Sequence, residues 1–203
     1  MPDCRISFII PCYNESGNIH HLSERIRTVF SDENIQLIFV DDGSSDSTLK
    51  EIAALSQESA AVLFVSFSRN FGKEAAMLAG LERAQGSYTV LIDADMQQDP
   101  FVVREMVSIL DNNDDIDCVC AVPAKRKESF MVSFLKNAYY RIINGISDIE
   151  MKENASDFRC FRNNVREALL STEEHDRFTK GLFAWAGFKT EYIEYEVDRK
   201  SVV

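Results

Sequence analysis

Residues 35–55 read IQLIFVDDGSSDSTLKEIAAL, and this stretch decides the fold. Its first part is almost uniformly apolar, as expected for a strand that is buried on both faces of a sheet. A polar turn of aspartate, glycine and serine follows. Apolar residues then recur three to four positions apart, which is the spacing of an amphipathic helix, and we expect Ser44 or Ser45 to cap that helix. A strand, a turn and a helix in this order form the repeating unit of α/β proteins.

The same alternation runs through the rest of the chain. We predict further strands at residues 5–10, 62–67, 88–92, 117–122, 157–161 and 190–197. We predict further helices at residues 16–30, 73–84, 129–146, 163–170 and 178–185, a helix that starts at Asp99-Pro100, and a loop at residues 147–155. Ser16 is expected to cap the first of these helices. The pattern predicts an α/β fold with a mostly parallel sheet flanked by helices on both faces. No linker or repeat is visible, so residues 1–203 are expected to form a single domain.

The composition argues against several classes of protein. The chain has 22 basic and 33 acidic residues, a net charge of -11, whereas general nucleic-acid binding needs a positive surface. The 5 cysteines include no CxxC pair, so we expect a reducing compartment and neither a disulfide framework nor a zinc cluster. His20, His21 and His175 have no metal-ligand companions and are expected at the surface. Without a leader or an apolar run of about 18 residues, the chain as given is expected to be soluble or peripheral.

Four of the predicted strands end in polar segments. These segments are residues 11–15, 41–46, 68–73 and 93–99. Turns favour such residues for conformational reasons, so a single segment of this kind would indicate only a turn. In an open α/β sheet, however, ligands bind beyond the carboxyl ends of the strands. Four polar ends at adjacent strands therefore predict a shared ligand site.

The sharpest chemistry lies in Asp93-Ala94-Asp95, which directly follows an apolar strand. Mg²⁺ and Mn²⁺ are hard cations that take oxygen ligands, often one or two carboxylates together with substrate phosphates. Such an ion would neutralise a diphosphate leaving group. Gln97 is a candidate for a further metal ligand or a phosphate contact. A D-x-D triplet alone is weak because it is common by chance in acidic proteins, and its position after a strand strengthens it.

Two other strand ends carry candidate ligand groups. Asp41 and Asp42 are candidates for ribose hydroxyls or a base edge, and the alternative is a turn followed by a helix cap. Arg69 and Lys73 are the natural cations for a phosphate or a base, and the alternative is a solvated helix start. A cation at a helix N-terminus opposes the macrodipole, which favours the functional interpretation. The chain has no G-x-x-x-x-G-K-[ST], G-x-G-x-x-G or G-x-S-x-G motif.

Three of these segments together resemble the inverting family-2 glycosyltransferases of the Rossmann-like GT-A fold. They are residues 10–15 (IPCYNE), 40–48 (VDDGSSDST) and 93–100 (DADMQQDP). The closer resemblance is to the polyprenyl-phosphate branch, which includes dolichol-phosphate mannose synthases and undecaprenyl-phosphate glucosyltransferases. It rests on residues 68–74 (SRNFGKE), 156–159 (SDFR) and 180–188 (KGLFAWAGF).

The resemblance implies transfer of a hexose from a UDP- or GDP-sugar to a polyprenyl phosphate, with inversion and with Mg²⁺ or Mn²⁺. The donor site that it implies consists of Pro11, Tyr13, Asn14, Glu15, Asp41, Asp42, Gly43, Lys73, Asp93, Ala94 and Gln97. The implied metal ligands are Asp93, Asp95 and Gln97. The implied catalytic and acceptor-side residues are Asp95, Asp157, Arg159 and Arg126, the last of these for the lipid phosphate. A phosphate acceptor is already ionised at neutral pH, so Asp157 is assigned to orientation first and to base catalysis second.

The chain departs from the branch at two points. Pro123 stands where the branch usually has an arginine, which weakens the assignment of Arg126. After an arginine that resembles Arg199, the branch commonly continues into membrane helices, so we expect a chain truncated before such helices and a full-length protein at the cytoplasmic face of the membrane. Residues 129–146, with the basic residues 125–127, predict either a membrane-surface helix or a core helix.

Other functions remain open at this stage. A family-2 enzyme with a saccharide acceptor, as in capsule or polysaccharide synthesis, is the alternative, and residues 157–159 favour the polyprenyl phosphate over it. A nucleotidyltransferase also uses strand-end carboxylates with Mg²⁺, but the glycine-rich basic loop typical of that class is absent. A non-catalytic nucleotide-sugar-binding module is disfavoured by the intact carboxylate pair. The base, the sugar and the oligomeric state are not determined by these patterns.

Overall fold

The structure is a computed structural model that describes residues 4–124, 157–171 and 187–196. The elements in chain order are β1 (Ile6–Cys12), α1 (Asn18–Val29), β2 (Ile35–Asp41), α2 (Thr48–Glu58), β3 (Val62–Ser66), α3 (Lys73–Leu81), β4 (Tyr88–Leu91), α4 (Phe101–Asn112), β5 (Cys118–Pro123), β6 (Arg159–Arg162), α6 (Asn163–Ser171) and β7 (Thr190–Tyr195). Each lies within a few residues of a predicted element. The helices predicted at residues 129–146 and 178–185 and the loop at 147–155 lie outside the described residues.

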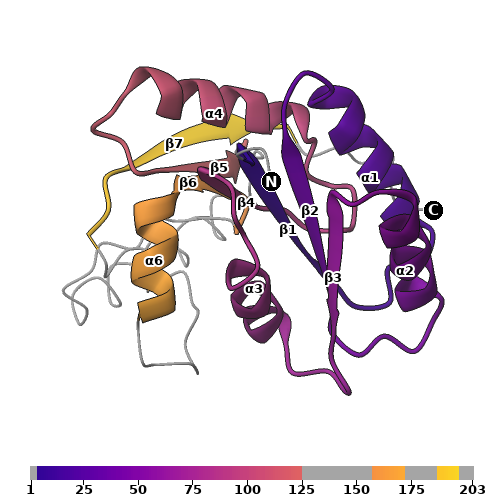
Figure 1. The fold of residues 1–203 in the computed structure, drawn as a ribbon. Coiled ribbons are helices and arrows are strands. Elements are labelled where there is room, and N and C mark those ends of the chain that lie inside the picture. Colours follow the sequence, from indigo (N-terminus) through magenta and orange to yellow (C-terminus); the bar gives the residue numbers. More distant parts are fainter. Residues whose placement is uncertain (1–3, 125–156, 172–186, 197–203) are drawn as a thin grey trace, which may run out of the picture.

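The strands form one mixed sheet in the order β3-β2-β1-β4-β6-β5-β7 (Figure 1). β1 to β4 are mutually parallel, and β5 is parallel to β7. β6 lies between β4 and β5 and is antiparallel to both. The predicted α/β class with a mostly parallel sheet is therefore confirmed. Because β6 is antiparallel, its first residues lie at the same edge of the sheet as the carboxyl ends of β1 to β4, where the ligand site is predicted.

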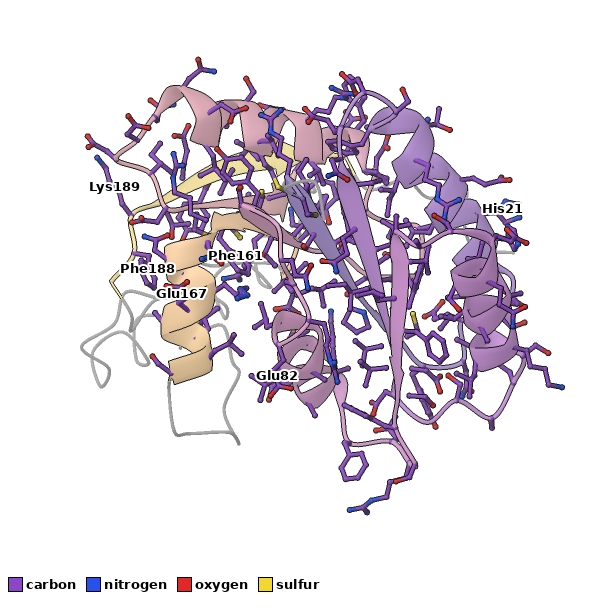
Figure 2. The ribbon with its side chains drawn as sticks, viewed as in Figure 1. His21, Glu82, Phe161, Glu167, Phe188 and Lys189 are labelled. Carbon is purple, nitrogen blue, oxygen red and sulfur yellow. The ribbon has the colours of Figure 1, made fainter. Side chains whose placement is uncertain are left out.

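Helices cover both faces of the sheet, as predicted. α1, α2 and α4 pack on one face, where the core includes Phe8 and Phe39. α3 and α6 pack on the other face against Ile9, Ile38 and Phe161, and Phe161 lies beside α6 in Figure 2. Phe8 and Ile9 point to opposite faces because side chains alternate along a strand. Both are fully buried, so β1 is covered on both sides as a parallel strand requires.

The predicted helix caps are wrong at two positions. α1 follows Gly17 rather than a capping Ser16, and the Ser16 hydroxyl donates a hydrogen bond to Glu51 of α2. α2 follows Ser47 rather than Ser44 or Ser45. The reason is that the Ser16 side chain binds α2, and the Ser44 and Ser45 side chains bind Asn14 after β1, instead of capping their own helices.

The loops after β1 and β2 are cross-linked by hydrogen bonds. The Asn14 backbone N–H donates to the Ser44 hydroxyl at 3.0 Å, and the Asn14 side-chain oxygen accepts from the Ser45 backbone N–H at 2.9 Å. The Ser16 backbone N–H donates to Asp46 at 3.1 Å. These contacts fix two of the four predicted polar strand ends relative to each other.

The cysteines and two of the three histidines lie in the described part of the structure. All five cysteines are free thiols. His20 and His21 are exposed on α1, and Figure 2 shows His21 at the outer surface of that helix, as predicted. His175 lies outside the described residues. Among the described helices, none is long and apolar enough to cross a membrane.

Candidate active site at the carboxyl ends of the strands

A cavity of about 330 Å³ lies at the carboxyl ends of β1, β2 and β4 and the start of α3. It is lined by Pro11, Cys12, Tyr13, Glu15, Asp42, Asn70, Gly72, Lys73, Asp93, Ala94 and Asp95. These residues come from all four of the predicted polar strand ends. The four ends meet because β3, β2, β1 and β4 are consecutive and parallel in the sheet. Most of the predicted donor-site residues therefore surround one cavity.

Lys73 connects the two predicted halves of the site. Its Nζ lies 2.5 Å from Oδ1 of Asp93 and 3.1 Å from Oδ2 of Asp157. Asp157 comes two residues before the start of β6, and Leu91 of β4 pairs with Arg159 of β6. The antiparallel course of β6 thus carries Asp157 to the end of β4, beside Asp93. Burial lowers the pKa of Lys73, but the attraction of Asp93 and Asp157 outweighs it, so the pKa is raised overall.

Asp93 is held in place by Gln98, a residue that the sequence did not single out. The Gln98 side-chain oxygen accepts a hydrogen bond from the Asp93 backbone N–H at 2.9 Å. The Gln98 nitrogen donates to Oδ2 of Asp93 at 3.1 Å. Gln98 is buried. Local sequence does not distinguish Gln98 from its neighbour Gln97, because only the turn geometry decides which amide points inward.

Asp95 occupies the second position of the triplet and also lines the cavity. Its Oδ1 accepts a hydrogen bond from the Gln97 backbone N–H at 3.0 Å. Met96 between them has a φ of 61°, in the left-handed region, which closes a tight turn after β4. The Gln97 side chain is not part of the described cavity lining, and its role as a metal ligand stays a prediction. Ala94 is buried, so the small residue between the aspartates packs into the core.

Glu15 adds a third carboxylate close to the aspartate pair. Burial raises the pKa of Glu15, and the charges of Asp95, Asp93 and Asp46 raise it further. A hydrogen bond from the Asn18 side chain, at 2.8 Å, lowers it and only partly compensates. The raised pKa of Glu15 thus reflects its burial first and the neighbouring carboxylates second.

Asp41, the last residue of β2, and Asp42, which follows it, stabilise loops. Asp42 is buried and accepts hydrogen bonds from the backbone N–H groups of Phe71 at 2.7 Å and Gly72 at 2.9 Å. Asp41 is buried outside the described cavity lining and accepts from Ser66 and from the Ser44 backbone. Both carboxylates thus hold neighbouring segments, and Asp42 also borders the cavity. Their predicted contact with a nucleoside stays a prediction.

Gly43 is required by the close approach of two loops. Its φ is +70°, and a Cβ atom at this position would lie 2.4 Å from the backbone carbonyl carbon of Arg69. The glycine therefore lets the turn after β2 pack on the backbone of the loop that leads into Lys73. The Arg69 guanidinium itself stacks over the Phe71 ring, 4.6 Å from its centroid. Gly43 and Asn14 lie outside the cavity lining, and their role in donor binding stays a prediction.

The remaining predicted residues are distributed as follows. Tyr13 lines the cavity with 49% of its surface exposed. Arg159 is buried in β6, two residues after Asp157, and the acceptor-side role of both stays a prediction. Arg126 lies outside the described residues. Cys12 lines the cavity, and burial raises the pKa of its thiol well above the usual range, so it is a poor nucleophile at neutral pH.

A larger hollow of about 690 Å³ lies at the opposite edge of the sheet, near the start of β4 and the end of β6. Its arginines support the fold. Arg162 donates to the backbone carbonyl of Ile116 at 2.9 Å, and Arg166 donates to that of Ala84 at 2.7 Å. These two arginines thus bind main-chain carbonyls, whereas most of the predicted ligand-binding residues line the smaller cavity.

The carboxylates of the smaller cavity fit a hard divalent cation. Asp93 and Asp95 line the cavity and offer carboxylate oxygens, the type of ligand that Mg²⁺ and Mn²⁺ prefer. Within residues 4–124, 157–171 and 187–196, no group of three or more His, Cys, Asp or Glu side chains is arranged to hold a metal ion. An ion that is held by one or two carboxylates and by substrate phosphates does not need such a group.

The chain is similar to known proteins in sequence. Residues 7–170 match the family described as Glycosyl transferase family 2. The chain is 38% identical over 199 residues to the Putative glycosyltransferase CsbB of Bacillus subtilis (strain 168), covering 97% of this chain and 60% of that protein. It is 32% identical over 197 residues to the Prophage bactoprenol glucosyl transferase homolog of Escherichia coli (strain K12), covering 94% of this chain and 63% of that protein. The chain thus spans less than two thirds of the length of these curated relatives.

Solved structures share the fold at lower identity. The mannosyltransferase PcManGT from Pyrobaculum calidifontis, in complex with GDP-Man and Mn²⁺, matches with a TM-score of 0.62 and 17% identity, over 97% of this chain and 58% of that chain. The glucosyl-3-phosphoglycerate synthase from Mycobacterium tuberculosis, with Mn²⁺, UDP and phosphoglyceric acid, matches with a TM-score of 0.64 and 21% identity, over 96% of this chain and 69% of that chain. These likenesses confirm the predicted GT-A fold.

Proposed function

The chain belongs to glycosyl transferase family 2, and from that premise we propose that it transfers a hexose from a UDP- or GDP-sugar to a polyprenyl phosphate, with inversion and with a divalent cation. One observation carries the proposal. Lys73, which lines the acidic cavity, contacts both Asp93, which we assign to the donor side, and Asp157, which we assign to the acceptor side. Donor and acceptor groups that meet at one point are what a direct displacement at the anomeric carbon needs.

On the donor side, we assign the cation to Asp95 and Asp93, with Gln97 as a further candidate. When bound, such an ion supplies positive charge against the nucleotide diphosphate as it leaves. Gln98 would keep Asp93 in its rotamer, and Met96 would keep the turn closed. Pro11, Tyr13 and Glu15 line the part of the cavity assigned to the nucleoside.

On the acceptor side, Asp157 and Arg159 would orient the attacking phosphate. A phosphate is already ionised at neutral pH, so the reaction needs alignment more than it needs a base. The lipid acceptor is supported by the relatives that are named bactoprenol glucosyl transferase, which are 32% identical to this chain. With such an acceptor, the protein would work at the surface of a membrane, and we assign it to the cytoplasmic face.

A binding screen followed by a transfer assay tests this function. UDP and GDP are titrated into the chain with and without Mn²⁺, and melting temperature is recorded. We expect one of the two nucleotides to raise it only when Mn²⁺ is present. No shift from either nucleotide, with folded protein, would contradict a nucleotide-sugar donor.

The transfer assay uses the radiolabelled sugar of the nucleotide that binds. Undecaprenyl phosphate and a soluble oligosaccharide serve as competing acceptors. Label in the organic phase supports the lipid acceptor. Label only in the oligosaccharide would overturn the lipid acceptor and retain the glycosyltransferase.

A further inference from the structure

The cavity carries an imbalance of charge. Among its described lining residues, Glu15, Asp42, Asp93 and Asp95 carry carboxylates, and Lys73 alone is positively charged. Asp42 is already engaged by two backbone N–H groups. Without a further cation, this cavity would repel a nucleotide diphosphate.

A metal ion bound at Oδ1 of Asp93 would compete with Lys73 for that atom. Oδ2 of Asp93 accepts a hydrogen bond from the amide of Gln98, whereas Oδ1 is the atom that pairs with Lys73. Gln98 thus engages one oxygen of Asp93 and Lys73 the other. The ion pair is partly open to solvent, because the side chains of Lys73 and Asp93 are 40% and 29% exposed. A partly exposed pair of this kind is weak and can exchange partners.

We propose that Lys73 is an exchangeable counter-ion, which occupies Oδ1 of Asp93 in the ligand-free protein and leaves it when a divalent cation binds together with the nucleotide diphosphate. This positioning role rests on the proposed function. Lys73 keeps its contact with Asp157 and donates to a phosphate oxygen in place of Asp93. The same side chain thus ties the occupancy of the donor site to the position of the acceptor-side carboxylate.

The exchange makes metal and nucleotide bind cooperatively. A metal ion alone must displace Lys73 from Asp93 and offers it no new partner. With the nucleotide present, Lys73 gains a phosphate oxygen, so the displacement costs less. Each ligand must then raise the affinity of the other by the same factor.

The test is Mn²⁺ affinity, measured by electron paramagnetic resonance with and without UDP or GDP, for wild type, Lys73→Met, Lys73→Arg and Arg69→Met. We expect Lys73→Met to bind Mn²⁺ alone about two- to fivefold more tightly, the change that corresponds to a partly exposed ion pair. The nucleotide should then raise its Mn²⁺ affinity by a smaller factor than in wild type. Lys73→Arg keeps the charge and should bind Mn²⁺ alone as wild type does.

Arg69→Met is the matched control, because it removes a cation four residues away that stacks on Phe71. Equal gains in Mn²⁺ affinity from Arg69→Met and Lys73→Met would overturn the proposal and indicate a general field effect. Unchanged or weaker Mn²⁺ binding by Lys73→Met, with an unaltered melting temperature, would also overturn it. Neither result affects the proposed function, which fails separately if wild type binds no nucleotide diphosphate in the presence of Mn²⁺.

Discussion

The side-chain amide of Gln98 binds Asp93 at two points: it accepts a hydrogen bond from the Asp93 backbone N–H at 2.9 Å and donates one to the Asp93 carboxylate at 3.1 Å. A planar amide that binds both groups fixes the backbone and the rotamer of Asp93 together. The first carboxylate of the D-x-D triplet is thus oriented by the residue five positions further along the chain.

Replacing Gln98 with leucine should weaken nucleotide binding in the presence of Mn²⁺ by about tenfold, which corresponds to roughly 1.4 kcal/mol from one lost buried hydrogen-bonding partner. The measurement is calorimetric titration of UDP or GDP with Mn²⁺. Gln98→Glu should weaken nucleotide binding at least as much, because it brings a second carboxylate against Asp93.

Gln57→Leu, at an exposed position of α2, is the control for a glutamine-to-leucine change and should leave binding unchanged. Wild-type affinity in Gln98→Leu would show that Asp93 keeps its orientation without the amide.

Asp95→Asn should lower the affinity for the nucleotide with Mn²⁺ by about tenfold or more, because an amide is a poorer ligand for a hard cation than a carboxylate. Its hydrogen bond from the Gln97 backbone can persist, since the amide oxygen also accepts. The free energy of unfolding should therefore change little, and urea denaturation checks this.

Asp99→Asn is a carboxylate control in the same turn, where Asp99 pairs with Arg25 at 3.2 Å. We expect it to bind nucleotide and Mn²⁺ as wild type does. Equal losses in the two variants would remove Asp95 from the metal site.

Gly43→Ala should destabilise the protein by more than about 2 kcal/mol, since a left-handed φ and a backbone clash act together. The added Cβ would lie 2.4 Å from the Arg69 carbonyl carbon. The measurement is the free energy of unfolding in urea.

Gly17→Ala separates the effect of the left-handed φ from the effect of the backbone clash. Gly17 has a φ of +90° but has nothing within 4 Å of the added Cβ. It should cost about 1 kcal/mol, from the conformation alone. Similar losses at both positions would mean that the loop near Arg69 moves aside for the methyl group.

Glu15→Gln should raise the free energy of unfolding at neutral pH. Burial and the charges of Asp95 and Asp93 raise the pKa of Glu15, so ionisation of Glu15 disfavours the folded state. As pH rises from about 4.3, the usual pKa of glutamate, through the raised folded value, the wild-type protein loses stability, because Glu15 ionises more readily in the unfolded chain. The Asn18 hydrogen bond can persist, because glutamine also offers an accepting oxygen.

Urea titrations of both proteins across this pH range provide the measurement. The difference in stability should be largest above the raised pKa and should vanish below about 4.3. A constant difference at every pH would indicate a packing effect instead of an electrostatic one. Glu58→Gln, at the exposed end of α2, serves as the control and should give no difference in this range.

Local sequence patterns were sufficient for the elements and for most of the residues that line the cavity. The run at residues 35–40 is apolar apart from Gln36, and it forms a buried strand because its period and composition leave no amphipathic helix face. Asp93 and Asp95 follow a strand, and strand ends of a parallel sheet share one edge. The predicted helix caps were wrong because the Ser16 and Ser44 side chains bind a neighbouring segment, α2 and Asn14 respectively, and the sequence does not say which segment is near.

What the sequence determined by itself is the order of strands and helices, the α/β class and the identity of the polar groups at the strand ends, because these depend on residues close together in the chain. Only the tertiary structure decided that β6 runs antiparallel between β4 and β5. That placement brings Asp157 to Lys73 and, through Lys73, to Asp93. The folded turn also decided that Gln98, and not Gln97, binds Asp93. Such contacts depend on how distant or tightly turned segments meet in space, which no local periodicity encodes.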